Sequence, residues 1–114
     1  MERERIGRTL LVRVRGEVDV HTADIFRRDV DAWFLRGEAT RLVLNLSRVT
    51  FLDSTGLGAV LGRLRRAQES GRSMALVPPT GVARMMIDVG ALGRVLPLYR
   101  SERLALAEEA AVNG

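Results

Sequence analysis

The sequence predicts an α/β domain built on a mostly parallel sheet of four to five strands, with about four helices. Short apolar runs alternate along the chain with segments whose apolar residues recur at helical spacing. Strands that alternate with helices favour β-α-β crossovers, and such crossovers produce a mostly parallel sheet. A chain of 114 residues is long enough to bury one core, so residues 1–114 are expected to form a single domain.

The first third of the chain predicts a strand followed by a helix. Residues 9–15 end in alternating apolar and basic side chains, the period of a half-exposed strand, and Gly16 is expected to end it. A short strand near residues 3–8 is a candidate partner for it. Thr22 is the expected N-cap of the helix, and Gly37 is expected to end it. The apolar face of this helix consists of Phe26, Val30, Trp33 and Phe34.

The middle of the chain predicts a buried strand, a helix and a second short strand. The apolar run at residues 42–46 forms the first of these strands. The helix covers residues 55–70, and Gly71 follows it where a glycine commonly ends a helix. Residues 73–77 then form a strand that two consecutive prolines stop. The apolar face of the helix consists of Leu57, Val60, Leu61 and Leu64.

The last part of the chain predicts a helix, an edge strand and a final helix. Thr80 is the expected cap of the first helix, which Gly90 closes. Residues 95–99 form the last strand, placed at an edge because it contains a proline. Ser101 caps a final helix over residues 102–112. The buried face of the first helix is predicted to consist of Val82, Met85, Met86 and Val89.

Composition and charge indicate which partners and which cellular compartment to expect. The formal net charge is +4, but the arginines are scattered among acidic residues rather than gathered with aromatic ones, so no direct nucleic-acid partner is expected. No apolar run approaches the roughly 20 residues that span a membrane, and the charged N-terminus does not resemble a signal peptide. The absence of cysteine excludes disulfides and cysteine metal sites. We therefore expect a cytoplasmic protein that does not associate with membranes.

Polar residues gather at the junction between the strand at residues 42–46 and the helix after it. Asp53, Ser54 and Thr55 stand at the helix start, where a side-chain oxygen can accept an unpaired backbone N–H and where a phosphate is favoured. In a parallel sheet the loop that holds Asp19 lies at the same end, so Asp19, Asp53 and the Ser54 hydroxyl are expected to come close. Two carboxylates beside a hydroxyl at a helix start indicate a phosphoacceptor more than a catalytic centre.

Three other kinds of site fit the same residues less well. Gly56, Gly58 and Gly62 imitate a dinucleotide-binding fingerprint, but no acid stands at the end of the next strand to hold a ribose, so no cofactor is expected. A serine nucleophile needs a base, and His21 is the only histidine. Two carboxylates supply too few ligands for a metal. A small enzyme or a nucleotide-binding domain that uses these loops remains an alternative.

Gly58 and Gly62 indicate a docking surface. They fall on the side of their helix away from its apolar face, together with Ala59 and Arg66. A glycine inside a helix costs about 1 kcal/mol relative to alanine. On an outward face that cost suggests that another protein approaches the helix closely. The alternative is that the helix is turned differently and the glycines pack inside.

The sequence resembles the STAS domain, a family that includes bacterial anti-sigma factor antagonists, also called anti-anti-sigma factors. Residues 53–58, DSTGLG, match the family signature D-S-[ST]-G-L-G, and residues 16–23, GEVDVHTA, resemble its G-E-[LIV]-D-x-x-[ST]-A. Residues 81–99 fit the family's third helix and last strand. The resemblance covers nearly the whole chain, and the two motifs at this separation are fairly specific.

The resemblance implies a phosphorylation switch. The unphosphorylated protein binds an anti-sigma factor with serine kinase activity and frees a sigma factor, and a phosphatase resets the cycle. Ser54 matches the phosphoacceptor of the family. The residues expected around it are Asp19, Asp53, Thr55 and Gly56. The expected partner-binding residues are Gly58, Gly62, Arg66, Thr22 and His21. The alternative within the family is a STAS subunit of a stress-signalling or lipid-transport assembly, in which Ser54 is not phosphorylated.

Overall fold

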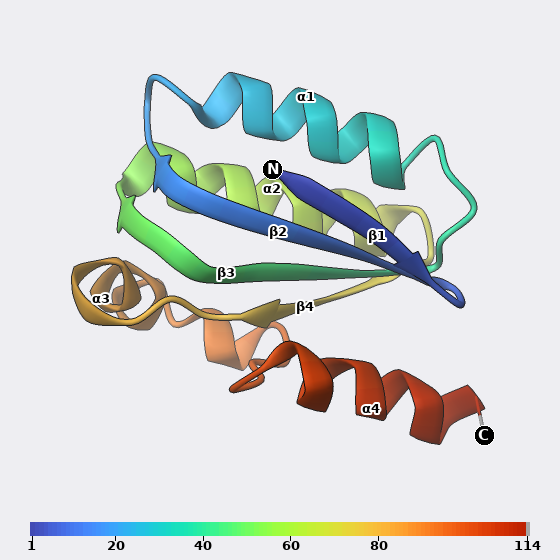
Figure 1. Ribbon diagram of the computed structural model, residues 1–114. Helices are drawn as coiled ribbons and strands as arrows, with labels where there is room; N and C mark the ends of the chain where they lie inside the picture. Colours follow the sequence, from blue (N-terminus) through green and yellow to red (C-terminus); the bar gives the residue numbers. More distant parts are fainter. Residues whose placement is uncertain (114) are drawn as a thin grey trace.

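The computed structural model describes residues 1–113 and confirms the α/β architecture (Figure 1). Four strands form one sheet in the order β1-β2-β3-β4. Strand β1 (Glu2–Ile6) is antiparallel to β2 (Thr9–Val18), as the candidate pairing near residues 3–8 suggested. Strands β2, β3 (Arg41–Leu52) and β4 (Ser73–Val77) are parallel to one another. The sheet is therefore mixed, with one antiparallel edge strand.

Helices cover both faces of this sheet. Helices α1 (Ala23–Phe34) and α2 (Ser54–Glu69) lie side by side on one face, and α4 (Glu102–Asn113) lies on the opposite face (Figure 1). Helix α3 (Gly81–Val89) packs against β3 and buries residues in the same core as α1 and α2. A short 3-10 helix, η1 (Leu92–Arg94), follows α3. Within residues 1–113, no helix is long and apolar enough to cross a membrane.

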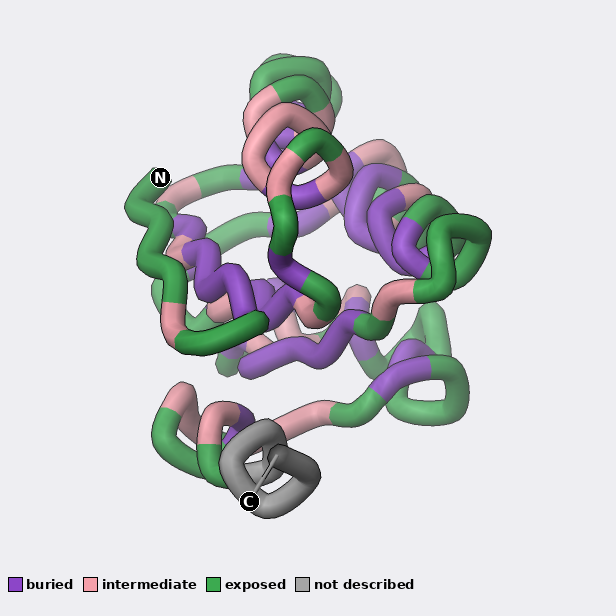
Figure 2. Tube along the Cα trace, turned by 90° about the vertical axis from the view of Figure 1, so that its right-hand side faces the viewer, coloured by how far each residue is buried: buried purple, intermediate pink, exposed green. Residues whose placement is uncertain are grey.

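The core has two parts, because successive residues of a strand point to opposite faces of the sheet. Leu10 and Val12 of β2 point toward the large core under α1, α2 and α3, whereas Leu11 points toward α4. The buried residues lie along the strands of the sheet and on parts of the helices that cover it (Figure 2). The core on the α4 side is much smaller and consists of Leu11, Val43, Ala75, Val77 and Ala105. The fold therefore depends mainly on the face that carries α1 and α2.

Two predicted helix boundaries are confirmed by backbone geometry. Gly71 has φ +73° after the end of α2. Its N–H donates to Gln68 O at 3.1 Å, and the N–H of Arg72 donates to Ala67 O at 2.7 Å, which is the Schellman arrangement. At the start of α4, the N–H of Leu104 donates to Ser101 Oγ at 3.2 Å. Both ends use the residue type that the sequence offers for that position.

Gly16 does not end the second strand, contrary to prediction. Strand β2 continues through Gly16 to Val18, and its register against β3 shifts between Arg13 and Arg15 and again between Gly16 and Glu17. Gly16 has φ +80°, a conformation that glycine adopts at little cost. The glycine therefore lets the strand bulge and carry on. Strand β3 likewise runs to Leu52, well beyond the predicted end at residue 46.

Residues 95–99 do not form the predicted last strand. Only Leu98 pairs with the sheet, in a single parallel bridge to Leu76 of β4. In this bridge the N–H of Leu76 donates to Pro97 O at 3.0 Å, and the N–H of Tyr99 donates to Leu76 O at 2.8 Å. The next bond of a parallel ladder would need the N–H of Pro97, which proline lacks. The segment is thus held at the sheet edge but cannot extend along it.

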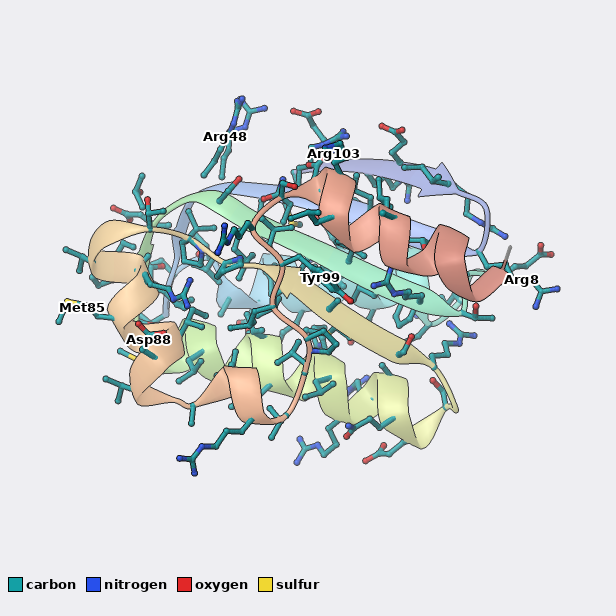
Figure 3. The ribbon with its side chains drawn as sticks, turned by 90° about the horizontal axis from the view of Figure 1, so that it is seen from below. Arg8, Arg48, Met85, Asp88, Tyr99 and Arg103 are labelled. Atoms are coloured by element: carbon teal, nitrogen blue, oxygen red, sulfur yellow. The ribbon has the colours of Figure 1, made fainter. Side chains whose placement is uncertain are left out.

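Helix α3 is turned differently from the prediction. Its buried residues are Ala83 and Ile87, both fully inaccessible to solvent. Val82, Met85 and Val89 are instead exposed by 69%, 63% and 80%, and Figure 3 shows Met85 pointing away from the molecule. Thr80 occupies the cap position, but its side chain makes no capping hydrogen bond. The helix is apolar on both sides, so hydrophobic spacing does not identify the buried one.

Candidate phosphorylation and docking site

The candidate site lies where β2 and β3 end. Val18 and Leu52, the last residues of these two parallel strands, are partners in the sheet register. After Val18 the chain enters the loop that contains Asp19, and after Leu52 it leads to the start of α2. The sequence prediction that both loops share one end of the sheet is therefore confirmed.

Asp53 joins the two loops. It is the N-cap of α2, with Oδ1 accepting the N–H of Gly56 at 2.8 Å. Its other carboxylate oxygen, Oδ2, accepts the N–H of Val20 from the neighbouring loop at 3.2 Å. One side chain thus caps the helix and fixes the loop after β2 against it. The start of α2 is positioned by its own N-cap residue.

Asp19 shapes its own loop. Its Oδ1 accepts the N–H of His21 at 2.9 Å, the N–H of Thr22 at 3.1 Å and the Thr22 hydroxyl at 3.3 Å. Burial raises the pKa of the Asp19 carboxyl, but these hydrogen bonds outweigh it and the pKa lies below its usual value. Asp19 is therefore charged and nearly buried. The direct contact between the two loops is made by Asp53, so the expected role of Asp19 beside the serine is indirect.

Thr22 has the cap position of α1 without the predicted capping bond. Its backbone is helical, and no side-chain cap is formed. The single proton of the Thr22 hydroxyl is shared between Glu17 O at 2.9 Å and Asp19 Oδ1 at 3.3 Å, and the hydroxyl oxygen accepts the N–H of Asp19 at 3.0 Å. Its hydroxyl is thus used inside the loop. His21, by contrast, is exposed at the surface of the same loop.

Ser54 is exposed as the first residue of α2. Thr55 follows it and is half-buried. The positive end of the helix dipole favours an anion at this place. Ser54 is open to solvent, and an anion on its side chain would lie beside the first N–H groups of the helix. The side chain is therefore suited to reversible modification.

Gly56 has a packing role that its motif position conceals. It is buried, and a Cβ placed there would overlap the carbonyl oxygen of Val18 and lie 2.8 Å from Leu52 Cδ1. Only glycine lets the first turn of α2 approach the end of β2 this closely. The contacts of Gly56 are with the sheet, and its predicted place around Ser54 stays a prediction.

The outward face of α2 carries the two predicted glycines. A Cβ at Gly58 or Gly62 would meet nothing within 4 Å. The Arg66 side chain is 54% exposed on the same helix. The helix is rotated slightly from the prediction, because Ala59 is buried with 1% exposure and Leu61 is 36% exposed. The predicted outward position is therefore confirmed for both glycines and wrong for Ala59.

Ion pairs that were not predicted from the sequence join α1 and α2. Arg63 Nε lies 3.1 Å from Asp31 Oδ1, and Arg66 Nη1 lies 3.2 Å from Asp31 Oδ2. The Arg63 side chain is only 5% exposed. The sequence signal for these ion pairs is Arg63 itself, a charged residue that stands three positions after Val60 inside the buried stripe of α2. No group of three or more metal-ligating side chains occurs in the part of the chain that the structure describes.

The comparisons with known proteins identify the family. Residues 1–105 match the STAS domain, and the chain belongs to the STAS domain family. It is 34% identical over 108 residues to a protein of Paenibacillus polymyxa named anti-sigma F factor antagonist, a match that covers 95% of this chain and 92% of the relative. The signature at residues 53–58 thus lies in a chain that is similar to such antagonists over nearly its whole length.

Two solved structures of the antagonist SpoIIAA are similar to this fold. The unphosphorylated form gives a TM-score of 0.81 at 27% identity, with 96% of each chain covered. The phosphorylated form, from Bacillus, gives a TM-score of 0.73 at 28% identity, with 94% of this chain and 96% of that chain covered. The fold of this chain is therefore one that is known in both phosphorylation states of a related protein.

Proposed function

We propose that this protein is an anti-sigma factor antagonist that phosphorylation of Ser54 switches off. The unphosphorylated form binds an anti-sigma factor with serine kinase activity and so releases a sigma factor, and a phosphatase restores the binding form. The observation that carries this proposal is an exposed serine at the first position of α2 in a chain similar to named antagonists. The protein acts by binding, in the cytoplasm, and needs no cofactor.

The local geometry supports a switch in surface charge rather than in fold. A phosphate adds about 1.5 to 2 negative charges at pH 7. Both carboxylate oxygens of Asp53 already accept backbone N–H groups, and the start of α2 favours an anion. The domain can therefore carry a phosphate at Ser54 without unfolding. The partner, which approaches the same end of α2, meets a new charge that must lose its hydration.

The docking face adjoins the serine on the same helix. Ser54, Gly58 and Gly62 are each one helical turn apart, and the glycines leave their surroundings open. A partner that lies along this face contacts the Ser54 hydroxyl directly. His21 and Thr22 stand in the loop that Asp53 ties to the start of α2. This arrangement supports the proposal that one modification controls binding.

The first test identifies the acceptor. Ser54→Ala should abolish phosphate incorporation when the protein is incubated with ATP and each purified anti-sigma factor kinase of the source genome, with intact mass as the readout. Thr55→Ala is the matched control and should be phosphorylated like the wild type. Undiminished incorporation in Ser54→Ala contradicts the assignment and points to Thr55. No incorporation into the wild type by any kinase favours the alternative of a STAS subunit without a phosphorylation cycle.

The second test concerns the consequence of the charge. Ser54→Asp should weaken binding of the kinase while the melting temperature stays close to that of the wild type, because an acid at a helix start is tolerated. Calorimetric binding and thermal melting of the same preparation measure both effects. A variant that melts far below the wild type would mean that binding is lost through unfolding, and the electrostatic explanation would then be wrong.

A further inference from the structure

Arg63 is a buried cation whose pairing is incomplete. Its side chain is 5% exposed, and its Nε lies at ion-pair distance from Asp31. Neither Nε nor Nη1 has a hydrogen-bond acceptor among the described residues, and both atoms are buried. Burial lowers the pKa of Arg63, Asp31 raises it, and Arg66, Arg27 and Arg65 lower it further. A buried charge in this state is costly unless more negative charge is brought near.

Among the described residues, Asp31 is the only acid that pairs with Arg63, and it is already shared. Asp31 serves Arg63 through Oδ1 and Arg66 through Oδ2. Arg27, on the same side of α1, is paired with Asp24 at 2.8 Å. We call Arg63, Arg65, Arg66 and Asp31 the basic groove. Glu69 stands one turn beyond Arg65 and Arg66, and positive charge still exceeds negative charge between the two helices.

The basic groove continues the flat part of the docking face. Arg65 and Arg66 follow Gly62 by three and four residues, so they lie one turn further along the outward side of α2. A shallow depression beside them is lined by Leu35, Arg65, Arg66, Glu69 and Ser70. A partner segment that crosses the glycines therefore places its next side chains over the two arginines. Guanidinium groups bind carboxylates with two parallel hydrogen bonds.

We infer that the basic groove binds an acidic segment of the docking partner, whose carboxylates pair with the exposed guanidinium groups of Arg65 and Arg66. This inference rests on the proposed docking of an anti-sigma factor along α2 and adds the chemistry of the segment that is bound. Arg65 and Arg66 make the first contacts because they are exposed. Arg63 holds Asp31 in place from below. Charge complementarity of this kind acts mainly on the association rate and its salt dependence.

The test uses charge reversal with a matched control. Arg65→Glu, which breaks no ion pair of the described structure, and Arg66→Glu should each weaken binding of the anti-sigma kinase at least about tenfold, mostly through slower association. Raising the salt concentration should weaken wild-type binding and affect these variants less. Arg103→Glu is the control, because Arg103 is exposed on α4, across the sheet from α2 (Figure 3). It should bind like the wild type.

The outcomes separate this inference from the proposed function. If Ser54→Asp prevents binding while Arg65→Glu and Arg66→Glu bind normally, the basic groove is not part of the interface and only this inference is wrong. Equal losses in Arg65→Glu and Arg103→Glu would reveal a general charge effect and overturn it as well. If no anti-sigma factor binds the wild type, the proposed function is wrong.

A partner-independent measurement completes the test. A short polyglutamate peptide titrated into the wild-type protein should shift the amide resonances of residues 62–66 in NMR spectra. The resonances of α4 should stay in place, and Arg65→Glu should abolish the shifts. Unperturbed spectra at saturating peptide, or shifts spread evenly over the surface, would contradict the acidic-segment assignment.

Discussion

The outward faces of α2 and α3 are built in opposite ways. On α2, the exposed positions include Gly58 and Arg65, and the partly exposed Gly62 leaves open space around it. On α3, the exposed positions are the large apolar residues Val82, Met85 and Val89. The hydrophobic pattern located the outer side of α2 almost correctly and misplaced that of α3, where only Met86 of the residues predicted to be buried packs against the core. In α2 the sequence periodicity identifies the buried side of the helix, whereas in α3 the fit of side chains against the sheet determines which side is buried.

The two helices differ in how strongly the composition of the exposed side contrasts with that of the apolar side. The exposed side of α2 contains glycine and arginine, so its apolar stripe stands out. In α3 the charged residues are Arg84 and Asp88, which pair with each other at 2.9 Å. The rest of the helix is apolar around most of its circumference. Ala83 is small enough for close contact with the sheet and Ile87 fills the space beside it, so packing selects this side over the larger stripe.

The largest effect on stability is expected from Gly56→Ala. A Cβ at this position would overlap the carbonyl oxygen of Val18, a backbone atom of a residue that pairs with Leu52 in the sheet. We expect the free energy of unfolding to fall by about 3 kcal/mol or more, the upper part of the range for overpacking. Urea unfolding measures it.

Gly58→Ala is the matched control for that variant. It makes the same substitution in the same helix, but the added Cβ meets nothing within 4 Å. The free energy of unfolding should rise by about 0.5–1 kcal/mol, the difference in helix propensity. Equal effects of the two alanines would mean that α2 does not approach β2 as the structure shows.

The second prediction tests which side of α3 is buried. Ile87→Ala should lower the free energy of unfolding by about 2–3 kcal/mol, because it leaves a cavity against β3. Val89→Ala should change it by less than about 0.5 kcal/mol, because Val89 is 80% exposed. Chemical denaturation of both variants measures the two changes in unfolding free energy. A larger loss of unfolding free energy for Val89→Ala than for Ile87→Ala would mean that the side of α3 predicted from the spacing is the buried one.

Local signals predicted the parts of the fold that depend on neighbouring residues. Strand β4 has the predicted bounds at residues 73–77, and Asp53 caps α2 as a polar residue before a helix should. The errors concern long-range geometry. Gly16 was expected to end a strand, but its pairing with β3 carries the strand onward through a bulge. Whether a glycine stops or bends a strand depends on the neighbouring strand, which local sequence does not show.

For the site, too, local sequence predicted where residues stand but not which contacts they make. The positions of Ser54 and of Gly58 and Gly62 follow from the strand–helix junction and the helix period. The contacts of Asp19 could not be predicted, because a carboxylate beside a loop can bond its own backbone or reach across to another loop. The role of Gly56 was also hidden, since only the approach of β2 makes a side chain impossible there.

The smallest effect on the fold, and a large one on binding, is expected when a side chain is added to the outward face of α2. Gly58→Leu and Gly62→Leu place leucine in open space, and leucine is the better helix former by several tenths of a kcal/mol. Thermal melting should therefore occur at an unchanged or slightly higher temperature. The affinity for the anti-sigma kinase should fall sharply, because the leucine holds the partner's backbone away from the helix.

Alanine at the same positions distinguishes obstruction from other causes of lost binding. Gly58→Ala and Gly62→Ala should melt at least as high as the leucine variants, because alanine has the highest helix propensity, yet they should bind more tightly because the added group is small. Calorimetric titration of all four variants with the same kinase preparation gives this order. Leucine variants that melt well below the wild type would place the glycines against the core. Leucine variants that are stable and bind like the wild type would show that the partner docks elsewhere, and the exposed apolar face of α3 would then be the next surface to test.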